Sequence, residues 1–233
     1  TYRLDRGSLG PLSSFRTASL IQDAFQKWNR VDTSWIQFAR NSSDLPDDIT
    51  ANNYSRIINN LPNDANPIIF DNDGEIVNML LGNGSKENII GLATNFSNQD
   101  RYVGVRVIFN GYFFSKQKSS EQEIFSTVLH EVGHVFGLDH TQHSRHLRNG
   151  IGMDDSKISI MFPTSTDDDS QRNELSFDDI ISISNLYPTI FHNTSTGGIK
   201  GRVRRGTREL PGVNVIARDV ENPEERIATT VTG

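Results

Sequence analysis

One stretch of eleven residues constrains this chain more than any other. Residues 130–140 read His-Glu-Val-Gly-His-Val-Phe-Gly-Leu-Asp-His. His130 and His134 are four residues apart, so on a helix they lie on one face, one above the other. Gly137 follows the second histidine and can adopt the left-handed conformation that ends a helix. The chain can then turn and present His140 from a different direction.

Three imidazoles and one carboxylate at these offsets predict a catalytic zinc site. Three protein ligands leave a fourth position open, which is typical of catalytic rather than structural zinc. Glu131 is rotated by about 100° from the ligand face, so it can lean over the open side of the metal. Zinc lowers the pKa of its bound water to about 7. Glu131 would take the proton from that water and pass it to the leaving amine, while the ion polarises the scissile carbonyl.

The residues before the motif fit a helix, which places the first two histidines on it. Residues 119–123 (Ser-Ser-Glu-Gln-Glu) supply cap candidates and early acidic side chains, which suit a helix N-terminus. Apolar residues then recur at helical spacing through residues 124–135, and we interpret them as core. The alternative to a metal site is an ordinary helix with histidines on its surface.

The motif with its glycine and third histidine resembles the metzincin signature. Residues 159–163, Ser-Ile-Met-Phe-Pro, resemble the turn where metzincins pack a methionine beneath the zinc histidines, here Met161. An ordinary core methionine is the alternative. Astacin-like and serralysin-like relatives have Tyr where this chain has Pro163, whereas Met-Phe-Pro is similar to the Met-Tyr-Pro of matrixins, the matrix metalloproteinase group. This resemblance implies that Phe162 and Pro163 form a wall of the primed-side specificity pocket.

The resemblance extends to both ends of a catalytic domain. Residues 24–31 (Ala-Phe-Gln-Lys-Trp-Asn-Arg-Val) are similar to the first matrixin helix, and residues 175–188 are similar to the last. Ser176 and Asp179 form a capping-box variant. Asp178 and Asp179 either stabilise this helix N-terminus, which we favour, or anchor backbone near the site as in matrixins. The resemblance implies an α+β fold with a twisted mixed sheet, an active-site helix and a C-terminal helix.

Several strands are expected around this framework. Alternation predicts a strand over residues 103–109, and an apolar run predicts another over 68–70. Within residues 19–38 a helix is expected from the apolar spacing between Leu20 and Trp28, followed by a short strand at residues 35–38. Residues 41–66 are interpreted as an irregular loop. Residues 89–94 resemble the matrixin edge strand, whose Gly91, Leu92 and Ala93 would pair with an extended substrate. An internal strand without substrate contact is the alternative.

The turn after the strand at 68–70 is a candidate calcium site. Asp71, Asp73 and Glu75 supply the oxygen ligands that calcium prefers. Position 82, where an EF-hand loop has its final glutamate, is Gly82, so a plain acidic turn is the alternative. Matrixins bind calcium near this position. No histidine precedes His130, so a second, structural zinc of the matrixin type is not expected.

The C-terminal part predicts a second module. Residues 193–198 form a linker by composition, and residues 199–203 and 212–217 are expected strands joined by a turn at 210–212. Their pattern resembles the start of a carboxypeptidase-regulatory-like β-sandwich domain, too short to fold alone. We therefore expect a catalytic domain over 1–192, a linker over 193–198 and a partial β-sandwich over 199–233 of a longer protein. His143 and His146 are interpreted as part of a solvated loop.

Composition narrows the class of partner. The net charge of −6 gives no support for nucleic-acid binding, and no apolar run approaches the length of a membrane span. The chain has no cysteine, which excludes disulfides, cysteine metal sites and a latency cysteine within it. From the resemblance we expect a secreted or cell-surface protein, acting as a monomer on a protein or peptide substrate.

These observations favour a zinc-dependent endopeptidase. The first alternative is a non-catalytic zinc-binding adhesion or interaction module that kept the metzincin fold. Glu131 argues against that alternative, because a mere metal site has no need of this carboxylate. The second alternative is an exopeptidase or a narrow processing enzyme.

Overall fold

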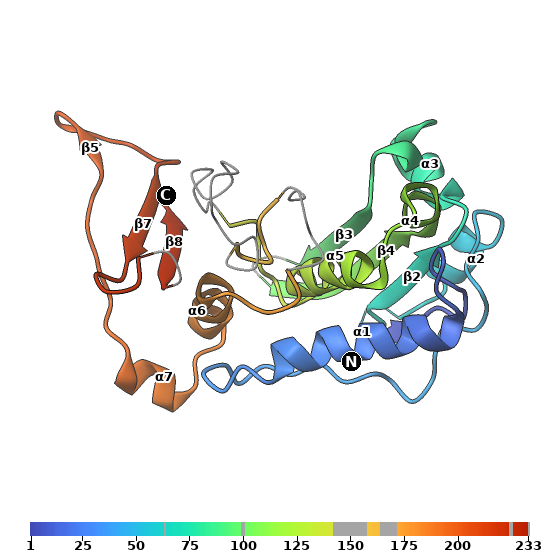
Figure 1. Cartoon of the computed structure of the whole chain (residues 1–233), viewed down its shortest axis with the longest axis horizontal. Coiled ribbons are helices and arrows are strands. Elements are labelled where there is room, and N and C mark those ends of the chain that lie inside the picture. The colour runs from blue at the N-terminus through green and yellow to red at the C-terminus, as the bar shows by residue number, and fades with distance from the viewer. Residues whose placement is uncertain (63, 99–100, 142–157, 164–171, 224–225, 233) are drawn as a thin grey trace. The chain divides into compact units, whose positions relative to one another are not determined.

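The computed structural model of the chain (Figure 1) describes residues 1–62, 64–98, 101–141, 158–163, 172–223 and 226–232. His143 and His146, interpreted above as part of a solvated loop, lie outside these residues. The chain forms two compact units. Unit 1 consists of Thr1–Gln26 and Gln37–Gly137, and unit 2 of Lys27–Ile36 and Leu138–Gly233.

Unit 1 contains a mixed sheet with the strand order β1-β2-β4-β3, as the α+β prediction requires. The strands are β1 (Arg3–Leu4), β2 (Pro67–Asp71), β3 (Gly91–Asn98) and β4 (Arg101–Asn110). β2 runs parallel to β1 and β4, and all five of its residues are buried, which explains its continuous apolar run. β3 runs antiparallel to β4 and lies at the edge of the sheet, as the resemblance implied.

Two long helices cover this unit. Helix α5 (Glu121–Val135) contacts β3 and β4, and Val128, Leu129 and Val132 on it are fully buried. Ser120 and Glu123 form a complete capping box, which confirms the predicted start of this helix. Helix α1 (Ser14–Asn29) buries Phe25, which stacks on Tyr2 with ring centroids 3.8 Å apart.

The segment 41–66 is more ordered than the irregular loop that was expected. It contains α2 (Tyr54–Ile58), and five of its apolar side chains belong to a buried cluster with residues of the sheet and of α3 (Glu75–Leu81). A helix of five residues is too short to show a helical period, which is why the pattern was missed. The cluster consists of Leu45, Ile49, Tyr54, Ile57, Ile58, Ile69, Ile76, Val77 and Ile108.

Other local differences involve short elements. Helices α3 (Glu75–Leu81) and α4 (Gly111–Gln117) and the 3-10 turn η1 (Ser85–Glu87) were not predicted. The strand expected at residues 35–38 was a wrong prediction, because this segment forms none. There the Trp35 backbone N donates to the Tyr187 carbonyl oxygen, while the Trp35 side chain packs edge-on against the Tyr187 ring. Aromatic content alone had suggested a strand.

Unit 2 contains helices α6 (Phe177–Leu186) and α7 (Ile190–Ser195) and two small antiparallel sheets. The capping box of Ser176 and Asp179 is present at the start of α6, as predicted. Helix α7 includes part of the expected linker. Strands β5 (Arg204–Arg205) and β6 (Arg208–Glu209) form one pair, and β7 (Asn214–Arg218) and β8 (Ile227–Val231) form the other. Residues 199–203 form no strand, because β7 pairs with β8 instead.

None of the helices in the described part of the chain is long and apolar enough to cross a membrane.

Candidate metal centre

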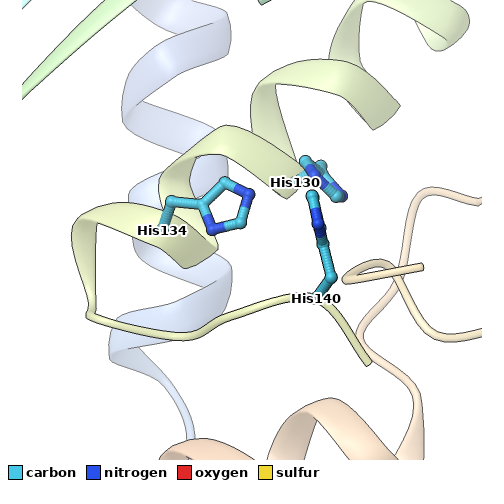
Figure 2. Close-up of side chains that lie close together, drawn as sticks. All are labelled: His130, His134 and His140. Carbon is cyan, nitrogen blue, oxygen red and sulfur yellow. The ribbon is translucent and has the colours of Figure 1, made fainter. Parts of the chain in front are cut away.

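Three histidines from α5 and the chain that follows it converge on one point (Figure 2). His130 and His134 lie one turn apart on α5, with ring centroids 4.9 Å apart. Gly137 adopts a φ of +85°, so the chain leaves the helix in the left-handed conformation that was predicted. His140 then approaches from the segment beyond it, and the ligand atoms of the three side chains all lie within 4.8 Å of one another.

The donor set fits zinc. Imidazole nitrogens are common zinc ligands, and three of them leave the fourth tetrahedral position for water or substrate. Within the described ranges, this is the one group of three or more potential metal-binding side chains that the structure brings together. The residues that the sequence singled out as zinc ligands are therefore the residues that the fold assembles.

Glu131 occupies a buried position between the helix and the edge strand. Its side chain is 8% exposed, and burial raises the pKa of its carboxyl from 4.5 to about 8. A Cβ added to Gly91 would lie 2.8 Å from Oε1 of Glu131, so the carboxylate packs directly against the start of β3. A bound cation would favour the ionised carboxylate and lower its pKa. The predicted general base and the predicted substrate-pairing strand are thus neighbours.

The turn that carries Met161 is buried and tied to the residue after the third histidine. Met161 is 2% exposed, and the Phe162 backbone N donates to the Ser159 carbonyl oxygen at 3.1 Å to close the turn. The Thr141 backbone N donates to the Met161 carbonyl oxygen at 2.9 Å. Phe162 is buried, and Pro163 is exposed. The methionine turn and the segment of His140 therefore hold one another in place.

Asp179 anchors this turn as well as the helix. Its carboxylate accepts hydrogen bonds from the backbone N of Ile160 at 2.9 Å and of Met161 at 3.2 Å, and from the Ser159 hydroxyl at 2.5 Å. It also accepts from Ser176 in the capping box. Burial raises the pKa of Asp179, although these donors lower it. Asp179 therefore both caps α6 and anchors the backbone of the methionine turn.

Arg172 is a candidate for supporting the methionine turn that no sequence pattern indicates. It is 4% exposed, and its Nη2 donates to the carbonyl oxygens of Ser159 at 2.9 Å and Ile160 at 3.0 Å. Position 172 lies in a polar stretch without periodicity, so no local pattern indicates that its side chain is buried.

The three acidic residues of the calcium prediction have other partners. Asp71 accepts from the Val77 backbone N at 2.8 Å, and Asp73 accepts from the Glu75 backbone N at 3.1 Å. Glu75 forms an ion pair with Lys86, with Nζ and Oε1 2.5 Å apart. Among the residues described, these carboxylates do not assemble as a metal-binding group. Calcium at this turn stays a prediction.

A model of a known protein family matches this chain. The family model described as matrixin, a peptidase family, matches residues 1–188, which include all three histidines, Glu131 and the methionine turn. No match was found among curated proteins. The matched range covers most of the chain and contains the whole candidate centre, so this protein belongs to the matrixin family of metallopeptidases.

Proposed function

We propose that this matrixin is a zinc-dependent endopeptidase in which Glu131 is the general base. The observation that supports the proposal is the convergence of three imidazoles beside a buried carboxylate. The ligand atoms of His130, His134 and His140 lie within 4.8 Å of one another. Glu131 is next to the first ligand and packs against the edge strand. A metal-binding module without turnover has no need for a carboxylate buried at that position, where ionisation is costly.

Different residues of the chain have different roles in the proposed peptide hydrolysis. When bound, zinc supplies a Lewis acid that polarises the scissile carbonyl and makes the attacking water more acidic. Glu131 accepts a proton from that water and delivers it to the leaving nitrogen. Met161 is proposed to support the histidines from its buried turn, and Phe162 with Pro163 to form the primed-side wall.

Strand β3 is proposed to align the substrate. It is an edge strand, paired with β4 on one side. An extended peptide can add to such an edge through main-chain hydrogen bonds, here along Gly91, Leu92 and Ala93. Because Gly91 contacts Glu131, a peptide held on this edge would lie beside the general base. Pairing along an open edge does not require a chain terminus, which favours cleavage inside a polypeptide.

The test compares fragments released from a mixed protein substrate. The zinc-loaded full chain is incubated beside Glu131→Ala and beside Glu121→Ala, which removes an exposed carboxylate from the same helix. We expect the wild type and Glu121→Ala to release internal fragments that the Glu131→Ala sample lacks. Fragments that begin only at substrate termini would indicate an exopeptidase. If the wild type and Glu131→Ala release the same fragments, the endopeptidase proposal is wrong and the non-catalytic module is favoured.

Two further proposals accompany this one. The first is calcium binding at the Asp71–Glu75 turn. Added calcium should then raise the melting temperature of the wild type more than that of Asp73→Ala, and an equal response in both would contradict the site.

We also propose that the protein acts outside the cytosol, because a protein-digesting metzincin is harmful there. Recovery of the protein only from the cytosolic fraction of its host would contradict this.

A further inference from the structure

Strand β8 lies outside the range that the matrixin model matches, yet it packs against α6 and contacts Thr141, the residue that follows the third histidine. The family match ends at residue 188, and β8 spans Ile227–Val231. Strand β8 contacts α6, and both elements belong to unit 2 with His140 and the methionine turn. We propose that the β7–β8 hairpin is a positioning element of the metal centre, and that Thr229 and Asp178 are its positioning residues.

The first contact is a buried polar cluster centred on Asp178. This side chain is 2% exposed, and its Oδ1 accepts from the Thr229 backbone N at 2.7 Å. Its Oδ2 accepts from the Thr229 hydroxyl at 3.1 Å and from the Thr141 hydroxyl at 2.5 Å. The two threonine hydroxyl oxygens are 2.9 Å apart. A buried carboxylate needs such donors, and hydrogen bonds to a charged group are among the strongest in proteins.

The cluster reaches the metal centre through Thr141. This residue follows His140 directly, and its backbone N donates to the Met161 carbonyl oxygen. Thr229 therefore fixes Asp178, Asp178 fixes the Thr141 side chain, and Thr141 fixes the chain at the third ligand. Partners beyond the ligands orient a metal site, and their loss typically weakens metal binding.

The second contact is apolar and involves the proposed specificity wall. Ile227 is 1% exposed and packs in a cluster with Ile158, which precedes the methionine turn, and Phe162, which belongs to it. Arg226 adds a cation–π contact, with its guanidinium carbon 5.3 Å from the centroid of the Phe177 ring on α6. Strand β8 is thus attached by polar contacts to Asp178 and Thr141 and by apolar contacts to residues in and beside the methionine turn.

The zinc-affinity test uses the full chain and three conservative substitutions. Thr229→Val removes the hydroxyl and keeps the shape, Thr229→Ser keeps the hydroxyl, and Thr230→Val changes the exposed neighbour. Zinc dissociation constants are measured by competition with a chromophoric chelator. We expect Thr229→Val to weaken zinc binding by roughly three- to tenfold, because its hydroxyl orients a partner of the ligand segment. Thr229→Ser and Thr230→Val should match the wild type.

A double-mutant cycle shows whether the effect travels through the cluster. Thr141→Val removes the donor at the other end of the cluster. If the effect travels through the cluster, the loss of zinc affinity in the double variant Thr141→Val/Thr229→Val should be smaller than the product of the losses in the two single variants. Independent, multiplicative effects would overturn the proposal, and so would wild-type affinity in Thr229→Val. If Thr229→Val fails to fold, wild-type affinity in Thr141→Val alone overturns it in the same way.

The effect on specificity rests on the proposed peptidase function and is measured separately. Ile227→Ala opens space beside Phe162, whereas Val231→Ala changes a half-exposed residue of the same strand. We expect KM for peptides with a bulky apolar primed-side residue to change at least threefold in Ile227→Ala at nearly constant kcat, and not in Val231→Ala. An unchanged KM in both variants would overturn the role of Ile227 at the proposed specificity wall. A wild type that binds zinc as expected but cuts no peptide would refute the peptidase function and leave the positioning role standing.

Discussion

The proposed general base, Glu131, lies where a side chain at position 91 would meet it. An added Cβ at Gly91 would lie 2.8 Å from Oε1, and 3.0 Å from Cδ and Cγ, of Glu131. Contacts this short force a neighbour to move. The part of Glu131 that can move is its carboxylate end, which is the part that the proposed chemistry uses. The glycine at the start of β3 therefore leaves free the space that the carboxylate of Glu131 occupies.

Gly91→Ala should lower kcat more than it lowers stability. We expect kcat to fall by at least about tenfold, because a catalytic group displaced by about 1 Å can cost a hundredfold in rate. Zinc content and melting temperature should change little. In the Glu131→Asp background, whose shorter side chain withdraws from the added methyl, Gly91→Ala should cost little further activity.

The control is Gly198→Ala, because a Cβ at Gly198 would meet nothing within 4 Å. Equal kcat losses from Gly91→Ala in the wild type and in the Glu131→Asp background would show that the two residues act independently.

Glu131 also predicts a pH dependence of the metal-free protein. Its folded-state pKa is about 8 and its ordinary value is 4.5, so between these pH values the folded state binds more protons than the unfolded state. Stability must then fall as pH rises through this window. Each pKa unit corresponds to about 1.36 kcal/mol, so the decline should be on the order of several kcal/mol.

Denaturant unfolding of chelated protein at pH 5.5 and pH 8.5 measures this decline. Glu131→Gln carries a neutral side chain of the same shape, and we expect most of the difference between the two pH values to disappear in it. If wild type and variant lose the same stability, Glu131 is ionised in the metal-free fold and the burial argument is wrong.

At the scale of elements, helix α5 carries two of the proposed zinc ligands between well-defined ends. The capping box of Ser120 and Glu123 fixes its start, and Gly137 ends it with a φ of +85°. A non-glycine L-residue in the left-handed region costs roughly 1–2 kcal/mol, and asparagine tolerates this region better than most. The end of α5 therefore decides the direction from which His140 arrives.

Substitution of Gly137 tests this geometry. Gly137→Ala should lower the free energy of unfolding by about 1 kcal/mol or more and weaken zinc binding, whereas Gly137→Asn should be the milder of the two changes. Chemical denaturation and chelator competition measure both effects. Asparagine and alanine variants that bind zinc equally well would contradict a role for the left-handed conformation.

The elements with strong local signals could be predicted, and those without them could not. Capping residues and helical spacing predicted α5 and α6, and apolar alternation predicted β4. Helices α2 and α4 span five and seven residues, which is less than the length over which a period is visible. The aromatic residues at 35–38 suggested a strand, but Trp35 bonds to Tyr187, more than 150 positions away.

At the scale of the whole molecule, the three converging histidines could be predicted from the sequence, but the contacts that support them could not. His130, His134 and His140 lie within eleven residues, and local geometry is enough to bring them together. Asp178 bonds to both Thr141 and Thr229, which are 37 and 51 positions away. No spacing rule connects these positions, because such contacts depend on how α6 and β8 pack.

Long-range contacts also support unit 1. Asp5 is 4% exposed and accepts hydrogen bonds from the backbone N of Gly7, Ile49 and Phe70, which joins three segments. Burial raises the pKa of Asp5 to about 6 in spite of these donors. Buried aspartates thus connect segments that are distant in the chain in both units, Asp5 in unit 1 and Asp178 and Asp179 in unit 2.

The central claim is that one zinc ion on three histidines makes this chain a peptidase. A titration of zinc into chelator-treated protein, followed by the rate of peptide hydrolysis, tests it most directly. The rate should rise linearly from zero and level off at one zinc per chain, and His140→Ala should show no such rise at the same zinc concentrations. Hydrolysis at the full rate before zinc is added, or a rise that continues to two zinc ions per chain, would contradict the claim.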